Sequence, residues 1–171
     1  MKMKLPQSCW SPIIWTNSIR TATKAIAFYT IAISLVLITF IAYQMRGGDS
    51  TQLYNPLFEA DVRFSLQVIG GFFIYYLLQL IFFAGLMIYG LNRNVRGWLL
   101  PWLVTWFIVC LFQLIFGLWL VYGYYIYLEA TFAAFFDWIW MGYNIYCWLV
   151  VYGAYKELLE LQSPNIELLW P

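Results

Sequence analysis

The sequence has no histidine, and only 10% of its 171 residues are charged. Histidine is the usual general base near neutral pH and the commonest metal ligand, so its absence argues against both kinds of site. A soluble domain would be about one-quarter charged. The net charge of +1 gives no reason to expect nucleic-acid binding. The shortage of charge indicates a membrane protein instead.

Cysteine is also scarce, and the three that occur do not form a disulfide framework. Cys110 and Cys147 fall within apolar stretches, where cysteine usually acts as a small hydrophobic residue. Cys9 precedes the first of these stretches. It can be interpreted as a palmitoylated juxtamembrane thiol or as an inert free thiol.

Motifs for catalysis and cofactor binding are missing as well. The sequence contains no nucleophile–base constellation and no glycine-rich phosphate-binding loop. Glu129 and Asp137 bracket a short predicted outer loop, but two carboxylates supply too few oxygen ligands for Ca²⁺. Solvated loop ends are the simpler interpretation. We therefore expect no enzyme activity, no cofactor and no metal site.

Long uncharged stretches dominate what is present, at 25–45, 64–91, 97–128 and 138–155. A helix needs about 20 predominantly apolar residues to cross a hydrocarbon core of ~30 Å. The first three stretches reach that length, and the fourth does so with the aromatic residues before Asp137. The sequence therefore predicts one all-α membrane domain over residues 1–171, with spans at about 22–45, 64–91, 97–127 and 135–157.

The basic residues predict the orientation of these spans. Seven of them fall on one side of the membrane: Lys2, Lys4, Arg20, Lys24, Arg93, Arg96 and Lys156. The main outer loop, 46–63, carries only Arg46 and Arg63. Because basic residues stay cytoplasmic, we expect both termini to be inside, with Arg20, Lys24, Arg93 and Arg96 as anchors. The predicted fold is a compact antiparallel four-helix transmembrane bundle, N-in and C-in.

Within this bundle, spans two and three are expected to pack as a hairpin and to be longer than the other two. Gln79 and Gln113 lie near the middle of these spans, so their amides would meet at similar depth and hydrogen-bond. Asn144, one turn into the fourth span, is expected to make a helix contact. The alternative is a polar pathway lined by all three side chains. Transporters usually also carry an ionisable residue at membrane depth, and the sequence indicates none, so packing is favoured.

Two segments carry a resemblance to a known family. They are YGLNRN (89–94) followed by LLPWL (99–103), and YCWLVVYGAYKEL (146–158). In these motifs, and in its longer first outer loop and short last one, the chain resembles the insect four-span family that includes Pasiflora and Fire exit. The resemblance implies a multi-pass plasma-membrane protein of septate junctions, which form the paracellular barrier, at lateral cell contacts.

The predicted function is therefore a structural or scaffolding role in cell junctions. The expected partners are the lipid bilayer and other membrane proteins, mainly junction components, and a homo-oligomer is allowed. Two alternatives stay open. One is a small transporter or a transporter accessory subunit. The other is an endosomal or lysosomal four-span protein, since Glu157-Leu158-Leu159 and Glu167-Leu168-Leu169 loosely resemble acidic dileucine sorting signals.

Overall fold

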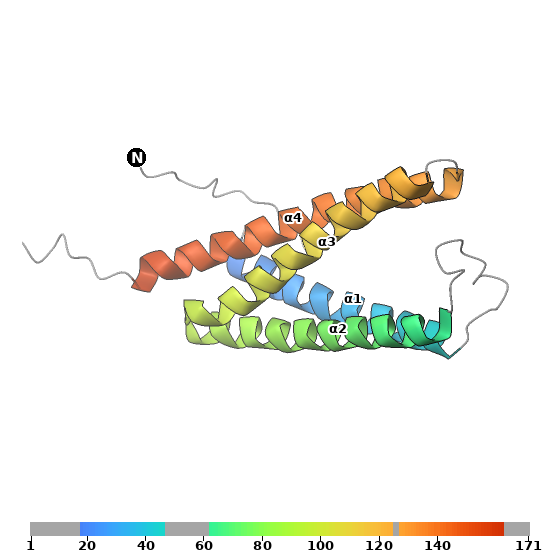
Figure 1. Ribbon diagram of the computed structural model, residues 1–171. Coiled ribbons are helices and arrows are strands. Elements are labelled where there is room, and N and C mark those ends of the chain that lie inside the picture. The colour runs from blue at the N-terminus through green and yellow to red at the C-terminus, as the bar shows by residue number, and fades with distance from the viewer. Residues whose placement is uncertain (1–17, 47–61, 125–126, 163–171) are drawn as a thin grey trace, which may run out of the picture.

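A computed structural model describes residues 18–46, 62–124 and 127–162 (Figure 1). The described chain is helical, as predicted. Its elements are α1 (Ile19–Met45), α2 (Val62–Arg93), the 3₁₀ helix η2 (Arg96–Leu99), α3 (Leu100–Tyr124) and α4 (Leu128–Gln162). Cys9, most of the outer loop 46–63 and the second dileucine-like segment lie outside the described residues.

Local chemistry explains the helix ends. The Ser18 hydroxyl accepts a hydrogen bond from the Thr21 N–H at 3.5 Å, which caps the start of α1. After α2, Asn94 adopts a left-handed conformation with φ of 55°. The Val95 N–H then donates to the Gly90 carbonyl at 2.9 Å. This 6→1 bond with an asparagine in the left-handed position is a Schellman motif, and it makes the turn into η2 tight.

Three helical segments, Ile19–Met45, Gln67–Arg93 and Arg96–Gly123, are long and apolar enough to cross a membrane. This confirms the prediction of a membrane protein. The fourth helix, α4, has 35 residues but does not meet the same criterion. Its stretch between Asp137 and Lys156 is uncharged, but tyrosine, tryptophan and Asn144 lower its hydropathy. The predicted span 135–157 lies within α4.

The helices form two antiparallel pairs rather than one compact bundle. Contacts concentrate between α1 and α2 and between α3 and α4, while α2 and α3 touch little after their turn. The two pairs meet at one end and diverge toward the other (Figure 1). Spans two and three form the predicted antiparallel hairpin, with Phe73 of α2 against Phe112 of α3 at a ring-centroid distance of 5.4 Å, but each packs more closely against its other neighbour than was predicted. A tight turn fixes where two helices begin, whereas side-chain size along them decides their angle.

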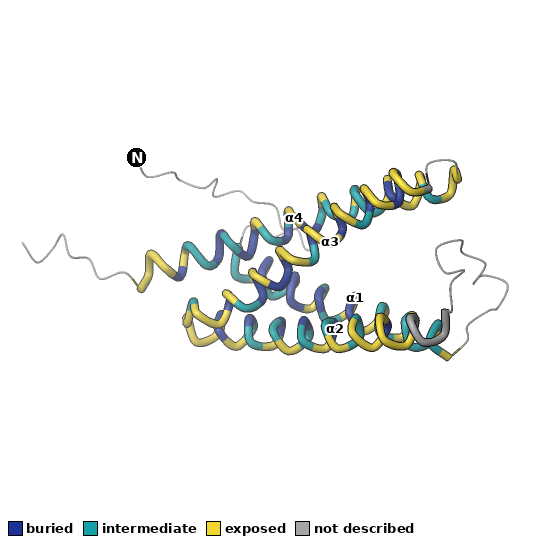
Figure 2. The backbone as a smooth tube through the Cα atoms, in the orientation of Figure 1, coloured by how far each residue is buried: buried dark blue, intermediate teal, exposed yellow. Residues whose placement is uncertain are grey.

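Side-chain size accounts for this shape. At the closed end, small residues allow close approach: Ala22, Ala27, Ala84, Gly153 and Ala154 are buried. The Trp102 and Trp106 rings of α3 stack nearby at a centroid distance of 4.9 Å, and both are buried. Figure 2 shows that buried residues gather on this side of the molecule. Within α1, the last buried residue is Ser34.

The helix lengths also differ from the prediction. The longest helices are α4 with 35 residues and α2 with 32, while α3 has 25. The reason is that the predicted last outer loop is helical. The N–H groups of Ala130 and Thr131 donate to the Tyr127 carbonyl at 3.1 and 3.2 Å, and α4 begins there. Alanine and phenylalanine then continue the helix through Asp137.

The predicted topology anchors lie at the closed end of the molecule. Arg20 of α1 forms an ion pair with Glu157 of α4, with 3.6 Å between Nε and Oε1. The Gln162 amide of α4 donates to the carbonyl of Asn94 in the α2–η2 turn. The start of α1, the turn between α2 and α3, and the end of α4 are thus held together. We call this the basic end, because it carries Arg20, Lys24, Arg93, Arg96 and Lys156.

Candidate functional site

A continuous series of hydrogen bonds joins α1, α3 and α4. The Trp140 indole N–H donates to Tyr29 Oη at 2.7 Å, and the Tyr29 hydroxyl donates to Asn144 Oδ1 at 3.4 Å. The Asn144 amide donates to Gln113 Oε1 at 2.8 Å. The Gln113 amide donates to Asp137 Oδ1 at 3.3 Å. We call these five residues the polar chain.

All four hydrogen bonds of the polar chain run in the same direction. An indole N–H can only donate, so Tyr29 accepts from Trp140, and the Tyr29 hydroxyl in turn donates to Asn144. Asn144 then presents its oxygen to Tyr29 and its amide protons to Gln113, and Gln113 repeats this toward Asp137. A carboxylate is an acceptor, so the series ends there. All four donors point the same way, and aligned bonds of this kind polarise and strengthen one another.

The residues of the polar chain on α3 and α4 lie far along their helices from the basic end. Gln113 is 13 residues beyond Leu100, or about 20 Å along α3. Asn144 is 12 residues before Lys156, or about 18 Å along α4, and Asp137 is 19 residues before it, or about 28 Å. Each of these distances is shorter than the ~30 Å thickness of a hydrocarbon core. The Asp137 carboxylate is the farthest of the three from the basic end.

Packing around the polar chain is close. Asn144 is 1% exposed and Gln113 is 5% exposed. The Asn144 carbonyl also accepts from the Trp106 indole at 3.2 Å. The Tyr29 ring contacts the rings of Trp106 and Tyr143 edge-on, at centroid distances of 6.3 and 5.4 Å. Aromatic rings therefore pack around Tyr29 and Asn144, two consecutive residues of the polar chain.

Further ring donors bond across helices nearby. The Trp102 indole donates to Thr30 Oγ1 at 3.3 Å and so links α3 to α1. The Tyr76 hydroxyl of α2 donates to the Thr105 carbonyl at 2.8 Å, and the Trp148 indole of α4 donates to the Leu103 carbonyl at 2.9 Å. Each carbonyl belongs to the first turns of α3. The four helices thus share polar contacts around the N-terminal part of α3.

The structure arranges the predicted polar residues differently from the sequence-based expectation. The Gln113 amide bonds to α4 and not to Gln79, which is half-buried and makes no side-chain hydrogen bond within the described chain. Asp137, expected at a solvated loop end, is half-buried and bonded to Gln113. The spacing of Asp137 and Asn144 held a signal, since residues seven apart lie on one helix face.

Some buried polar atoms have no hydrogen-bond partner in the described residues: Asp137 Oδ2, Trp138 Nε1 and Ser34 Oγ. The Trp138 indole packs directly on Gly117 of α3, where a Cβ atom would overlap it. Cys110 and Cys147 are buried free thiols. Among the described residues, no three metal-ligating side chains come together. The geometry of the site is therefore suited to hydrogen bonding between helices, and the Asp137 carboxylate accepts the last bond of the polar chain.

No family model, curated protein or solved structure matches this chain. The resemblance to the insect four-span family rests on the two quoted segments and stays a prediction.

Proposed function

We propose that the protein is a non-enzymatic membrane protein that crosses the bilayer four times and serves as a structural partner of other membrane proteins. The observation that carries this proposal is the polar chain, whose hydrogen bonds join helices of the same molecule. With the family resemblance, it supports a scaffolding role at lateral contacts of the plasma membrane, in a septate-type junction.

The contacts of α4 support a fourth crossing. Near the basic end, Trp148 bonds to the Leu103 carbonyl of α3. Farther along, Asn144 bonds to Gln113, and beyond that the Trp138 indole packs on Gly117. α4 therefore accompanies α3, which is apolar enough to span, through most of its length. A helix paired in this way with a spanning neighbour shares its depth in the bilayer.

The basic end supports an orientation with both termini inside. The start of α1 and the end of α4 meet there, together with the α2–α3 turn. Basic residues concentrate on the cytoplasmic side of membrane proteins. We therefore assign the basic end to the cytoplasm and the divergent end to the outside.

One observation favours the alternative function, transport. Asp137 is ionisable, bonds to Gln113 and lies at membrane depth, where such residues often mark proton or ion pathways. The polar chain itself is unsuited to proton transfer, however. It starts at an indole that cannot accept a proton, and each amide accepts and donates through different atoms. This chemistry favours holding helices over moving protons.

Two experiments test the proposal. In polarised epithelial cells, tagged protein should concentrate at lateral contacts, and its depletion should let a paracellular dye cross the cell layer. A uniform vesicular distribution with an intact dye barrier would contradict the junction role.

In liposomes carrying a pH-sensitive dye, the wild-type chain should leave a proton gradient as stable as the Gln113→Leu variant does. A leak that the substitution abolishes would support transport instead.

A further inference from the structure

The turn between α2 and α3 presents two arginines on a fixed backbone. Arg93 ends α2 and Arg96 begins η2. The segment between them is held by the bond from the Val95 N–H to the Gly90 carbonyl and by the bond from the Gln162 amide to the Asn94 carbonyl. Arg93 is exposed and Arg96 is half-buried, and both belong to a short turn that is tied to its own helix and to α4.

Neither arginine has an anionic partner in the described chain. At the basic end α4 carries two acidic residues: Glu157, which is paired with Arg20 at 3.6 Å, and Glu160, which is exposed. Arg93 and Arg96 form no ion pair with any residue that the structure describes. No Asp or Glu occurs between Val62 and Leu128 in the sequence. The turn is thus locally cationic, and a planar guanidinium is well suited to binding phosphate.

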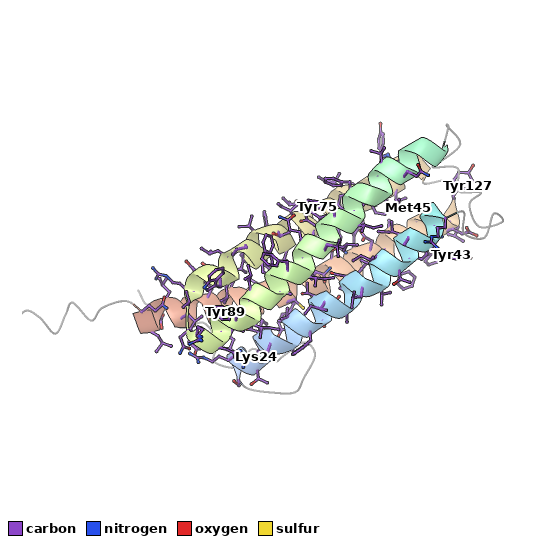
Figure 3. The ribbon with its side chains drawn as sticks, turned by 90° about the horizontal axis from the view of Figure 1, so that it is seen from below. Lys24, Tyr43, Met45, Tyr75, Tyr89 and Tyr127 are labelled. Atoms are coloured by element: carbon purple, nitrogen blue, oxygen red, sulfur yellow. The ribbon has the colours of Figure 1, made fainter. Side chains whose placement is uncertain are left out.

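Exposed aromatic rings adjoin these cations. The Arg93 guanidinium carbon lies 5.8 Å from the centroid of the Tyr89 ring, and the Trp98 ring meets Tyr89 edge-on at 6.1 Å. Tyr89 is 50% exposed and Trp98 is 39% exposed. Figure 3 places Tyr89 at the same end of the molecule as Lys24 of α1. Tryptophan and tyrosine favour the interface between headgroups and acyl chains.

We propose that this turn binds the headgroup of an anionic phospholipid, with Arg93 and Arg96 contacting its phosphate and the Tyr89 and Trp98 rings lying against its glycerol and upper acyl chain. A zwitterionic choline lipid fits less well, because its choline group would place a further positive charge beside the two arginines. A soluble phosphate would use the cations but not the rings. The proposal rests on the basic end facing the membrane surface, as the proposed function has it.

Binding can be measured on the purified full chain in detergent micelles, by native mass spectrometry with phosphatidylserine, with phosphatidylcholine and with inorganic phosphate. The wild-type chain should retain phosphatidylserine in preference to phosphatidylcholine. The double variant Arg93→Gln/Arg96→Gln should bind phosphatidylserine about 30-fold more weakly, since each arginine near a membrane surface contributes a several-fold attraction. The matched control Lys24→Gln/Lys156→Gln removes two charges from the same end and should keep most of the preference.

Three results would overturn the proposal: no preference for phosphatidylserine, an equal loss in both double variants, or displacement of the lipid by an equal concentration of inorganic phosphate. Helix content measured by circular dichroism identifies a misfolded variant, and Arg96→Gln alone, which leaves the Arg93–Tyr89 contact in place, then provides the comparison. A micelle has no sides, so this assay does not depend on orientation. An inverted topology would appear separately, as surface labelling at Asn94.

Discussion

Replacing Asn144 with leucine should destabilise the molecule by removing the centre of the polar chain. The substitution keeps a side chain of similar size but breaks the bonds from Tyr29 and to Gln113. Hydrogen bonds between membrane helices contribute about 0.6 kcal/mol on average and up to about 1.7. Two lost bonds, with a Gln113 oxygen left buried and unpaired, should lower the free energy of unfolding by about 1 to 3 kcal/mol.

The matched control is Gln79→Leu. It removes an amide from a half-buried position whose side chain has no hydrogen bond to a described residue. Its free energy of unfolding should change by less than about 0.5 kcal/mol, the usual range for sites without a specific contact. Unfolding of both variants can be followed by circular dichroism in mixed micelles as the fraction of denaturing detergent rises.

A double-mutant cycle sharpens this test. Once Asn144→Leu has removed its partner, Gln113→Leu should destabilise less than it does in the wild-type chain, because an unpaired amide is costlier than none. Strict additivity, or equal destabilisation by Gln79→Leu and Asn144→Leu, would refute the reasoning that the polar chain holds the helices together.

Two other substitutions test contacts that α4 makes near Asn144, one with α3 and one with α1. Gly117→Ala should lower the free energy of unfolding by about 1 to 3 kcal/mol, because its Cβ would overlap the Trp138 indole. The control Gly123→Ala, on the same helix but with open space around it, should change this free energy little. Equal effects of the two substitutions would contradict the close α3–α4 contact. Trp140→Phe removes the donor to Tyr29 and should destabilise by about 1 kcal/mol. Unfolding in mixed micelles measures this too, and a variant as stable as the wild type would show that the indole bond contributes nothing.

Hydropathy predicted the elements of this fold well but not their packing. Apolar stretches identify α1, α2 and α3 because each is long enough to cross a bilayer, whatever its neighbours are. The start of α4 was missed because Glu129 and Asp137 suggested a loop, although their backbone continues a helix. The divergence of the two pairs was missed because it depends on where small residues and the Trp102–Trp106 stack meet across helices.

The polar chain was only partly predictable for a similar reason. Sequence position gave the depth of Gln79, Gln113 and Asn144, but not the direction in which each helix turns its side chains. The Gln113 side chain faces α4, so the prediction from depth alone that it would bond to Gln79 was wrong. Asp137 looked isolated in sequence. It is part of the site because α4 begins at Leu128 and continues through Asp137, which places this side chain on the helix beside Gln113. The seven-residue spacing from Asp137 to Asn144 was the available signal.

The most direct test of the four-span account is to find which side of the membrane each helix end faces. Single cysteines can be placed at Arg46, Asn94, Ala130 and Gln162 in a Cys9→Ser background, since Cys110 and Cys147 are buried. On intact cells, an impermeant maleimide should label Arg46→Cys and Ala130→Cys. Asn94→Cys and Gln162→Cys should react only after permeabilisation. Labelling of both Ala130→Cys and Gln162→Cys on intact cells would show that α4 does not cross, and labelling of both Asn94→Cys and Gln162→Cys would show that the orientation is inverted.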